Sequence, residues 1–408
     1  MSGIRYILKD ASGRPGRGAD LSFLSPREAE RARAYHRTFP EYRPTPLVPL
    51  PSLARALGVS RVFVKDESHR FGLNAFKVLG ASYAIGRYLA RRLGEDISGV
   101  TPGRLAAPEV RERLGRITFV AATDGNHGRA VAWAAQQLGQ RAVIYMPKGS
   151  DPVRLANIRA HGADATITDL NYDDAVRLAD RMAREHGWVV VQDTAWPGYE
   201  DIPTWIMQGY ATLAVEALEQ LREHGVEAPT HLFLQAGVGS FAAGVAGFLA
   251  SALGDRMPVT AIVEPDRADC FYRSAEAGDG RPHAVTGDLS TLMAGLACGE
   301  PNPLGWEVLR DLARAYFSCP DWVAANGMRI LAAPLQGDPQ VVSGESGAVT
   351  CGLVERLCGS PDLADARAAL GLDGDATVLL VSTEGDTSPR TYREVVWYGR
   401  CPGELDRP

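Results

Sequence analysis

Short runs rich in valine and isoleucine alternate with segments of helical periodicity along most of this chain of 408 residues. The clearest runs are RVFVKDE at 61–67, ITFVAATD at 117–124, AVIYMP at 142–147, VVVQD at 189–193, HLFLQ at 231–235 and TVLLVS at 377–382. Strands separated by helices pair in parallel, and parallel sheets are covered by helices on both faces. The sequence therefore predicts an α/β fold made of three-layer αβα units with mostly parallel sheets.

The composition is that of a soluble globular protein, and the length suggests two or three domains. Hydrophobic residues make up 45% of the chain, charged residues make up 23%, and the formal net charge is -6. This charge and the lack of a long basic cluster argue against a nucleic-acid partner. No apolar run is long enough to span a membrane, and the N-terminus MSGIRYILKD lacks the apolar core of a signal peptide. We therefore expect a cytoplasmic protein without a membrane partner.

The cysteines form no C-x-x-C pair, so the sequence predicts neither a zinc site nor a disulfide scaffold. Most are expected to be buried thiols. Cys270 and Cys298 lie in polar or glycine-rich surroundings, and the sequence leaves open whether these two form a redox pair.

Unusual polar residues cluster where predicted strands end. In parallel sheets, ligands bind in the loops that follow the carboxyl ends of the strands. Four such loops stand out: TDGNHG at 123–128, QDTAW at 192–196, QAGVGS at 235–240 and STEGDTS at 382–388. We expect them to form one ligand-binding site.

Lys77 lies in the apolar run RFGLNAFKVLG at 70–80. A lysine in such a setting either extends its charge to the surface or has a lowered pKa, which makes the amine a nucleophile for carbonyl groups. Apolar Phe76, Val78 and Leu79 act to lower this pKa, whereas neighbouring carboxylates act to raise it. This run alone does not decide between the two interpretations.

The loop QAGVGS ends a predicted strand and begins a predicted helix. The backbone N–H groups of Gly237, Val238, Gly239 and Ser240 could converge there on an anion such as a phosphate. The loop matches neither the Walker pattern nor G-x-G-x-x-G, and glycines at such turns are often purely structural. Together, a phosphate loop and a nucleophilic lysine indicate pyridoxal phosphate as cofactor.

The loop TDGNHG carries Asp124, Asn126 and His127. The amide of Asn126 could donate to a ring oxygen of the cofactor, and the carboxylate of Asp124 could act as an acid or base. As alternatives, Asx–Gly pairs form turns, and His127 could serve only as a residue at a helix start.

Two further loops offer partners for a cofactor or substrate. Asp193 is either the N-cap of the next helix or a second charge in the cleft. Ser382 and Thr383 offer hydroxyl groups to a pyridine nitrogen, and the sequence does not say which one reaches it.

These motifs together resemble the fold type II pyridoxal-phosphate enzymes, the group that includes the threonine dehydratases and the tryptophan synthase β subunit. From about Ser22 to Gly399, longer blocks narrow the resemblance to the diaminopropionate ammonia-lyases. These blocks are RFGLNAFKVLG at 70–80, ATDGNHGRAVAWAA at 122–135, VVQDTAWPGYEDIPTWIMQGYATL at 190–213, MAGLACGEPNPLGWEVLRD at 293–311 and VSGESGAV at 342–349.

The resemblance implies a carbon–nitrogen lyase that converts D- or L-2,3-diaminopropionate through aminoacrylate to pyruvate and two molecules of ammonia. It implies a homodimer whose subunit has a large cofactor-binding domain (1–80 and 200–408) and a small domain (81–199), with the cofactor in the cleft. It also implies roles for individual residues: Lys77 as the Schiff-base lysine, Phe76 beside it, Asn126 on the ring oxygen, Gly237 to Ser240 on the phosphate, Ser382 or Thr383 on the pyridine nitrogen, and Asp124 and Asp193 as catalytic carboxylates.

Asp124 departs from the hydroxy-amino-acid dehydratases, which carry serine at this position. A carboxylate would repel the substrate carboxylate and favour a cationic amine, which disfavours serine or threonine as substrate. It could also act on the face of the substrate opposite Lys77, so that both enantiomers react. A dehydratase, a β-replacement synthase and a non-enzymatic pyridoxal-binding protein remain the alternatives.

Overall fold

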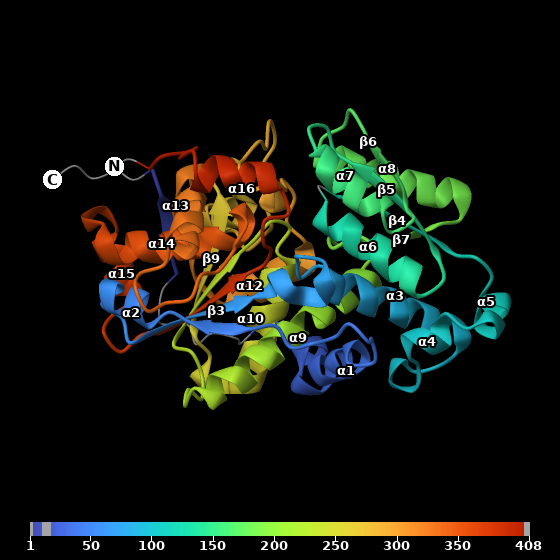
Figure 1. Ribbon diagram of the computed structural model, residues 1–408, viewed down its shortest axis with the longest axis horizontal. Coiled ribbons are helices and arrows are strands. Elements are labelled where there is room, and N and C mark those ends of the chain that lie inside the picture. The colour runs from blue at the N-terminus through green and yellow to red at the C-terminus, as the bar shows by residue number, and fades with distance from the viewer. Residues whose placement is uncertain (1–2, 10–17, 124, 404–408) are drawn as a thin grey trace.

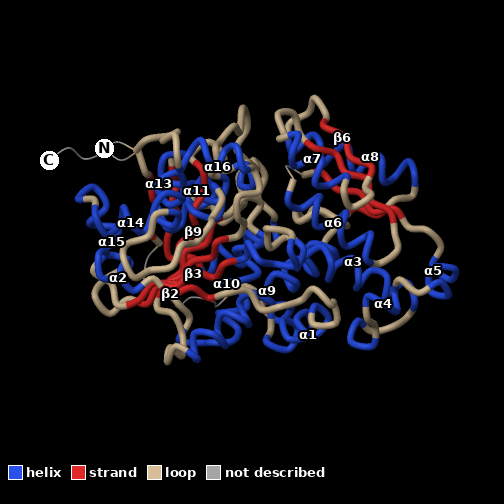
Figure 2. Tube along the Cα trace, viewed as in Figure 1, coloured by secondary structure: helices blue, strands red, loops and turns tan. Residues whose placement is uncertain are grey.

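The computed structural model describes residues 3–9, 18–123 and 125–403, and its strands form two separate sheets (Figures 1 and 2). The larger sheet has seven strands in the order β1-β10-β9-β8-β11-β3-β2, and the smaller has four in the order β6-β5-β4-β7. Among the strands of the described residues, β1 and β2 at the two edges of the larger sheet are the ones that pair antiparallel. The α/β fold with mostly parallel sheets is therefore confirmed.

The strands of the larger sheet are β1 (Arg5–Leu8), β2 (Leu47–Pro49), β3 (Arg61–Asp66), β8 (His231–Gln235), β9 (Val259–Pro265), β10 (Ala313–Cys319) and β11 (Thr377–Ser382). The strands of the smaller sheet are β4 (Thr118–Ala122), β5 (Arg141–Met146), β6 (Asp164–Ile167) and β7 (Val189–Val190).

Helices cover both faces of the larger sheet. Along β11, Leu379 and Val381 pack in the same core cluster as α9 and α10, whereas Val378 and Leu380 pack with α13 and α14. Successive side chains of a strand point to opposite faces, so this alternation places a helical layer on each side. The helices around this sheet are α1 (Pro26–His36), α2 (Pro51–Leu57), α9 (Asp201–Glu223), α10 (Ser240–Leu253), α11 (Cys270–Ala277), α12 (Pro303–Leu312), α13 (Asp321–Ala332), α14 (Glu345–Gly359), α15 (Ala364–Leu370) and α16 (Pro389–Val396).

The smaller sheet is also sandwiched between helices. Phe119 and Ala121 of β4 pack in one core cluster with α6, and Val120 and Ala122 pack in another with α8. The helices of this part are α4 (Pro102–Leu105), α5 (Pro108–Leu114), α6 (Asn126–Gln137), α7 (Pro152–Arg159) and α8 (Tyr172–His186). All four strands lie within 81–199, the range predicted for the small domain. The exact boundaries stay a prediction, because α3 (Val78–Leu93) crosses the first of them and packs on both α6 and α9.

Glycines let α3 and α9 approach closely. A Cβ atom at Gly80 would lie 2.6 Å from the Tyr210 ring, and one at Gly209 would lie 2.4 Å from the carbonyl oxygen of Leu79. No larger residue fits at either position without moving a helix. This close contact brings the start of α3, and with it Lys77, next to Tyr210.

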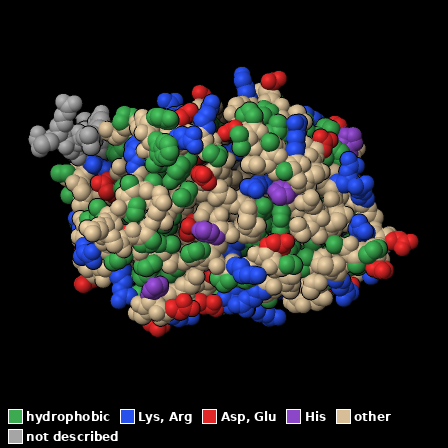
Figure 3. Space-filling view, viewed as in Figure 1, with side chains coloured by type: hydrophobic (Ala, Val, Ile, Leu, Met, Phe, Trp, Pro, Cys, Tyr) green, Lys and Arg blue, Asp and Glu red, His purple; other side chains and the backbone are tan. Residues whose placement is uncertain are grey.

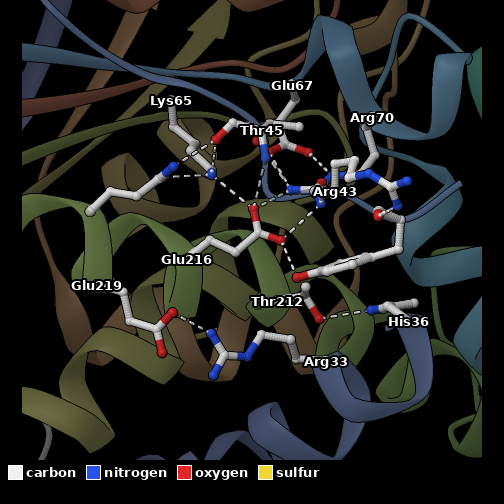
Figure 4. A network of polar contacts seen from close by, with 12 residues as sticks. Arg33, His36, Arg43, Thr45, Lys65, Glu67, Arg70, Thr212, Glu216 and Glu219 are labelled. Carbon is white, nitrogen blue, oxygen red and sulfur yellow. Dashed lines mark hydrogen bonds and ion pairs between the residues drawn. The ribbon is translucent and has the colours of Figure 1, made fainter. Parts of the chain in front are cut away.

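A buried cluster of four charges fixes the segment that leads into α3. Lys65, Glu67, Arg70 and Glu216 are each at most 1% exposed, and the first three lie above Glu216 in Figure 4. Glu216 accepts hydrogen bonds from Lys65 Nζ at 2.8 Å and from Arg70 Nη2 at 2.7 Å, and Arg70 also pairs with Glu67 at 2.8 Å. Burial alone would raise the pKa of Glu216, but Arg70 and Lys65 lower it to about 2.

On the face shown in Figure 3, Lys and Arg side chains are interspersed with Asp and Glu. Within the described ranges, every helix is too short or too polar to cross a bilayer.

We predict that Glu216→Ala lowers the free energy of unfolding by about 3–5 kcal/mol, because it leaves the Lys65 and Arg70 charges buried with a single carboxylate. Chemical denaturation followed by circular dichroism measures this change. Glu219→Ala on the same helix is the matched control. Its carboxylate, 48% exposed, pairs with Arg33, so its removal should cost less than about 1 kcal/mol. Equal losses for the two variants would contradict the assignment.

Candidate active site

The polar loops predicted from the sequence meet in one cavity between the two sheets. Its lining includes Phe76, Lys77, Asn126, Asp193, Gly237, Val238, Gly239, Ser240 and Thr383. Ser382 is absent from the lining, and Asp124 lies outside the described residues. Loops from both sheets thus contribute to the same cavity, as expected for the carboxyl ends of parallel strands.

Lys77 is held in the cavity by the segment before it, which pairs with the loop after β11. Phe76 N–H donates to Thr383 O at 3.1 Å, and Gly385 N–H donates to Asn74 O at 3.1 Å. Asn74 has a left-handed backbone with φ of 58°, a conformation that is uncommon outside glycine and that asparagine tolerates best. The tight path of residues 74–76 therefore brings Lys77 beside Thr383.

The ammonium of Lys77 pairs with the carboxylate of Asp193. Nζ lies 2.5 Å from Oδ2, and the Asp193 side chain is 4% exposed. The same nitrogen lies 5.4 Å from the centre of the Phe76 ring and 5.9 Å from that of Tyr210. Burial acts to lower the pKa of Lys77, but the charge and hydrogen bond of Asp193, together with the nearby Tyr210, outweigh it and the pKa is raised. The apolar neighbours therefore do not make this lysine neutral while Asp193 faces it.

Asp193 is the second charge in the cleft and not a helix cap, because the next helix, α9, starts only at Asp201. Burial would raise the pKa of Asp193, but Lys77 lowers it to about 2. Its backbone carbonyl accepts a hydrogen bond from Ser240 Oγ, and that hydroxyl accepts one from Asn302 Nδ2 at 2.7 Å. These contacts tie Asp193 to the start of α10.

The glycine loop leaves a set of backbone donors at the N-terminus of α10. Among the described residues, none accepts a hydrogen bond from the N–H of Gly237, Val238 or Gly239. Gly239, the N-cap, has φ of 90°, and a Cβ atom there would lie 2.1 Å from the Phe271 ring. Only glycine fits this turn, and the unpaired N–H groups together with the helix dipole favour an anion.

Asn126 and His127 begin α6, and both line the cavity. Asn126 Nδ2 donates to Glu384 Oε2. His127 is buried, and its Nε2 donates to Val191 O at 2.7 Å. Burial lowers the pKa of His127, so the ring is neutral. Its contact with Val191 joins α6 to the segment between β7 and Asp193.

The structure distinguishes Ser382 from Thr383. The Ser382 hydroxyl lies 2.8 Å from the hydroxyl of Ser343, away from the cavity. Thr383 lines the cavity, and its Oγ1 accepts a hydrogen bond from Gln235 Nε2 at 2.9 Å. Since that contact uses a lone pair of Thr383, its O–H remains available to a ligand.

Several cavity residues do not emerge from the sequence reasoning. Glu384, Gln235 and Cys298 line the cavity, and Tyr210 lies beside Lys77. The signal for Glu384 is its place in STEGDTS, directly after Thr383. Cys270 and Cys298 form no disulfide with each other in this structure.

Comparison with known proteins agrees with this site. Residues 38–384 match the family model described as pyridoxal-phosphate-dependent enzyme. The chain is 54% identical over 398 residues to the diaminopropionate ammonia-lyase of Salmonella typhimurium, covering 97% of this chain and 98% of that one. It belongs to the diaminopropionate ammonia-lyase family.

Crystal structures of relatives share the whole fold. The Escherichia coli diaminopropionate ammonia lyase in complex with an aminoacrylate–PLP azomethine reaction intermediate is 50% identical, with a TM-score of 0.89 and 98% of each chain covered. Its complex with D-serine gives a TM-score of 0.90 at 51% identity, again over 98% of each chain. The family is one of fold type II enzymes, and its cofactor is pyridoxal 5'-phosphate.

The functional groups that line the cavity match those of pyridoxal phosphate, independently of the comparison with relatives. It offers an amine, Lys77, and the unpaired N–H groups of the glycine loop at a helix N-terminus, which is the donor set that an aldehyde with a phosphate group requires. The hydroxyl of Thr383 and the amide of Asn126 supply two further polar contacts.

We predict that Asp193→Asn shifts the pH profile of cofactor uptake by the cofactor-free protein toward lower pH. Lys77 reacts with an aldehyde only as the neutral amine. Asp193 raises its pKa, so removal of this carboxylate increases the neutral fraction at a given pH. The rate of the absorbance change after addition of pyridoxal phosphate, measured from about pH 6 to 9, tests this.

Asp201→Asn is the matched control for this measurement. Asp201 forms an ion pair with Arg91 at the surface, where its side chain is 67% exposed, so its removal should leave the profile unchanged. Superimposable profiles of wild type and Asp193→Asn would show that Asp193 does not control the charge of Lys77.

Proposed function

We propose that this chain catalyses the α,β-elimination of 2,3-diaminopropionate to pyruvate and two molecules of ammonia. The observation that carries the proposal is the 54% identity over nearly the full length to a diaminopropionate ammonia-lyase. The cavity supports it, because it places a lysine amine, a buried carboxylate and a phosphate loop together.

When bound, pyridoxal phosphate withdraws electrons from the α-carbon of an amino acid joined to it and so acidifies the α-proton. Lys77 holds the cofactor at rest and, once released, takes the α-proton on its own face of the substrate. Asp193 balances the charge of Lys77 and binds the 3-ammonium of the substrate, or tunes these proton transfers. The buried setting of Asp193 keeps water from competing for either cation.

The lining of the cavity supports proposals for the remaining cofactor contacts. The N–H groups of Gly237 to Ser240 bind the phosphate, Asn126 donates to the ring oxygen, and Phe76 packs beside Lys77. We assign the pyridine nitrogen to Thr383 and not to Ser382, because only Thr383 lines the cavity. A hydroxyl partner leaves that nitrogen unprotonated.

We predict that the purified protein releases pyruvate and ammonia from diaminopropionate without an added nucleophile, at a rate well above that with serine or threonine. Lys77→Ala should lower this turnover by at least about 10³-fold, because it removes both the covalent link to the cofactor and a base. A coupled pyruvate assay on D- and L-diaminopropionate, D- and L-serine and L-threonine measures this.

Each alternative activity gives a different result in this assay. Ketobutyrate from threonine as the main product would indicate a dehydratase, and turnover that depends on an added nucleophile would indicate a β-replacement synthase. Full turnover by Lys77→Ala would exclude the proposed chemistry altogether.

Asp124 is proposed, from the sequence, as the base for the enantiomer whose α-proton faces away from Lys77. We predict that Asp124→Asn lowers kcat for one enantiomer of diaminopropionate at least about tenfold more than for the other, since only one proton transfer loses its base. Steady-state kinetics on the separated enantiomers measure the ratio. Equal losses would contradict a division of the work between two bases.

We also propose a cytoplasmic homodimer. The described cysteines form no disulfide, which fits a reducing compartment. Trp397 and Tyr398, 72% and 76% exposed, offer aromatic surface of the kind that subunit interfaces bury. Sedimentation of the purified protein as a single chain would contradict the dimer, and recovery in a membrane fraction would contradict the location.

A further inference from the structure

Glu384 is a buried carboxylate in the wall of the cavity, and the proposed reaction assigns it no role. Glu384 follows directly after Thr383, lines the cavity and is 2% exposed. A Cβ atom at Gly344 would lie 2.9 Å from Glu384 Cγ. The side chain is therefore closely enclosed and has little freedom to turn away.

Three donors converge on this carboxylate. Asn126 Nδ2 donates to Glu384 Oε2. Thr387 Oγ1 donates to the same oxygen at 3.2 Å. The backbone N–H of Ser346 donates to Oε1 at 3.3 Å. Because a carboxylate can only accept, the amide nitrogen of Asn126, and not its oxygen, must face Glu384.

The donor role of Thr387 is itself determined by a neighbour. Arg154 of α7 donates to Thr387 Oγ1 at 3.2 Å and forms an ion pair with Glu345 of α14 at 2.8 Å. Since arginine cannot accept, the hydroxyl of Thr387 is left to donate to Glu384. A continuous polar chain thus crosses the cleft from α7 to the loop after β11 and on to Asn126.

From these contacts we infer that Glu384 is a positioning residue that holds Asn126 as a hydrogen-bond donor to the ring oxygen of pyridoxal phosphate. One N–H of the amide is used by Glu384, and the second remains for the cofactor. Asn126 lies on the small sheet's side of the cleft and Glu384 on the large sheet's side. The Asn126 amide is therefore oriented toward the cofactor only while the two sides are in contact. The inference rests on the proposed contact between Asn126 and the cofactor.

The test is a double-mutant cycle of Glu384→Gln and Asn126→Ala. Two quantities are measured for each variant: the dissociation constant for pyridoxal phosphate and the pH dependence of the absorption band of the bound cofactor. We expect Glu384→Gln to weaken cofactor binding about tenfold and to shift the absorption titration, because a glutamine no longer fixes the orientation of the amide. In the Asn126→Ala background, the same change should have no further effect.

Glu355→Gln is the matched control, because Glu355 accepts a hydrogen bond from Asn326 at 2.9 Å outside the cavity. It should change neither quantity. Equal effects of Glu384→Gln in both backgrounds would overturn the inference, since they would show a general structural role. If Asn126→Ala changes both quantities and Glu384→Gln changes neither, the inference alone fails. If Asn126→Ala changes neither, the proposed contact of Asn126 fails and the inference with it.

Discussion

The buried charges of Lys65, Glu67, Arg70 and Glu216 constrain the rest of the site. Each buried ion costs several kcal/mol in lost hydration, and only a complete set of partners offsets this cost. The chain between β3 and α3 can therefore dock on α9 in one register, with both cations on Glu216. Arg70 is the first residue of the run 70–80, which ends at Gly80 in the close contact between α3 and α9. The ion pairs of Arg70 therefore also determine the position of Lys77, which lies within this run.

Polar contacts join the two sides of the cleft around the cavity, and breaking one of them costs free energy because it leaves a polar group without its partner. Lys77 pairs with Asp193, Arg154 pairs with Glu345, and Ser388 donates to Asp151 at 2.6 Å. In the first two pairs both side chains are largely removed from water, so separating them would leave charges without partners. The arrangement of the two sheets is thus coupled to the arrangement of the reactive groups.

The sequence was sufficient for the fold and for much of the cavity lining, because parallel strands bring the loops after them to one edge of the sheet. It could not decide the charge of Lys77, which depends on a carboxylate 116 residues away in the chain. Nor could it separate Ser382 from Thr383. They are neighbours in sequence, and which hydroxyl faces the cavity depends on where β11 ends. Glu384 was missed for a related reason, since its role emerges only from the direction in which the Asn126 amide points. The domain boundaries and the role of Asp124 stay predictions.

The pairing of Lys77 with Asp193 also bears on the choice of substrate. A carboxylate that is 4% exposed is stable in its charged form only beside a cation. Lys77 provides this cation in the free protein, whereas its nitrogen would no longer be a free ammonium group while it is bonded to the cofactor. A substrate with a second ammonium group can replace that charge beside Asp193, whereas serine and threonine bring only a neutral hydroxyl to the same place. Because the buried carboxylate of Asp193 requires a neighbouring cation, this site favours a diamino acid as substrate, independently of the argument from Asp124.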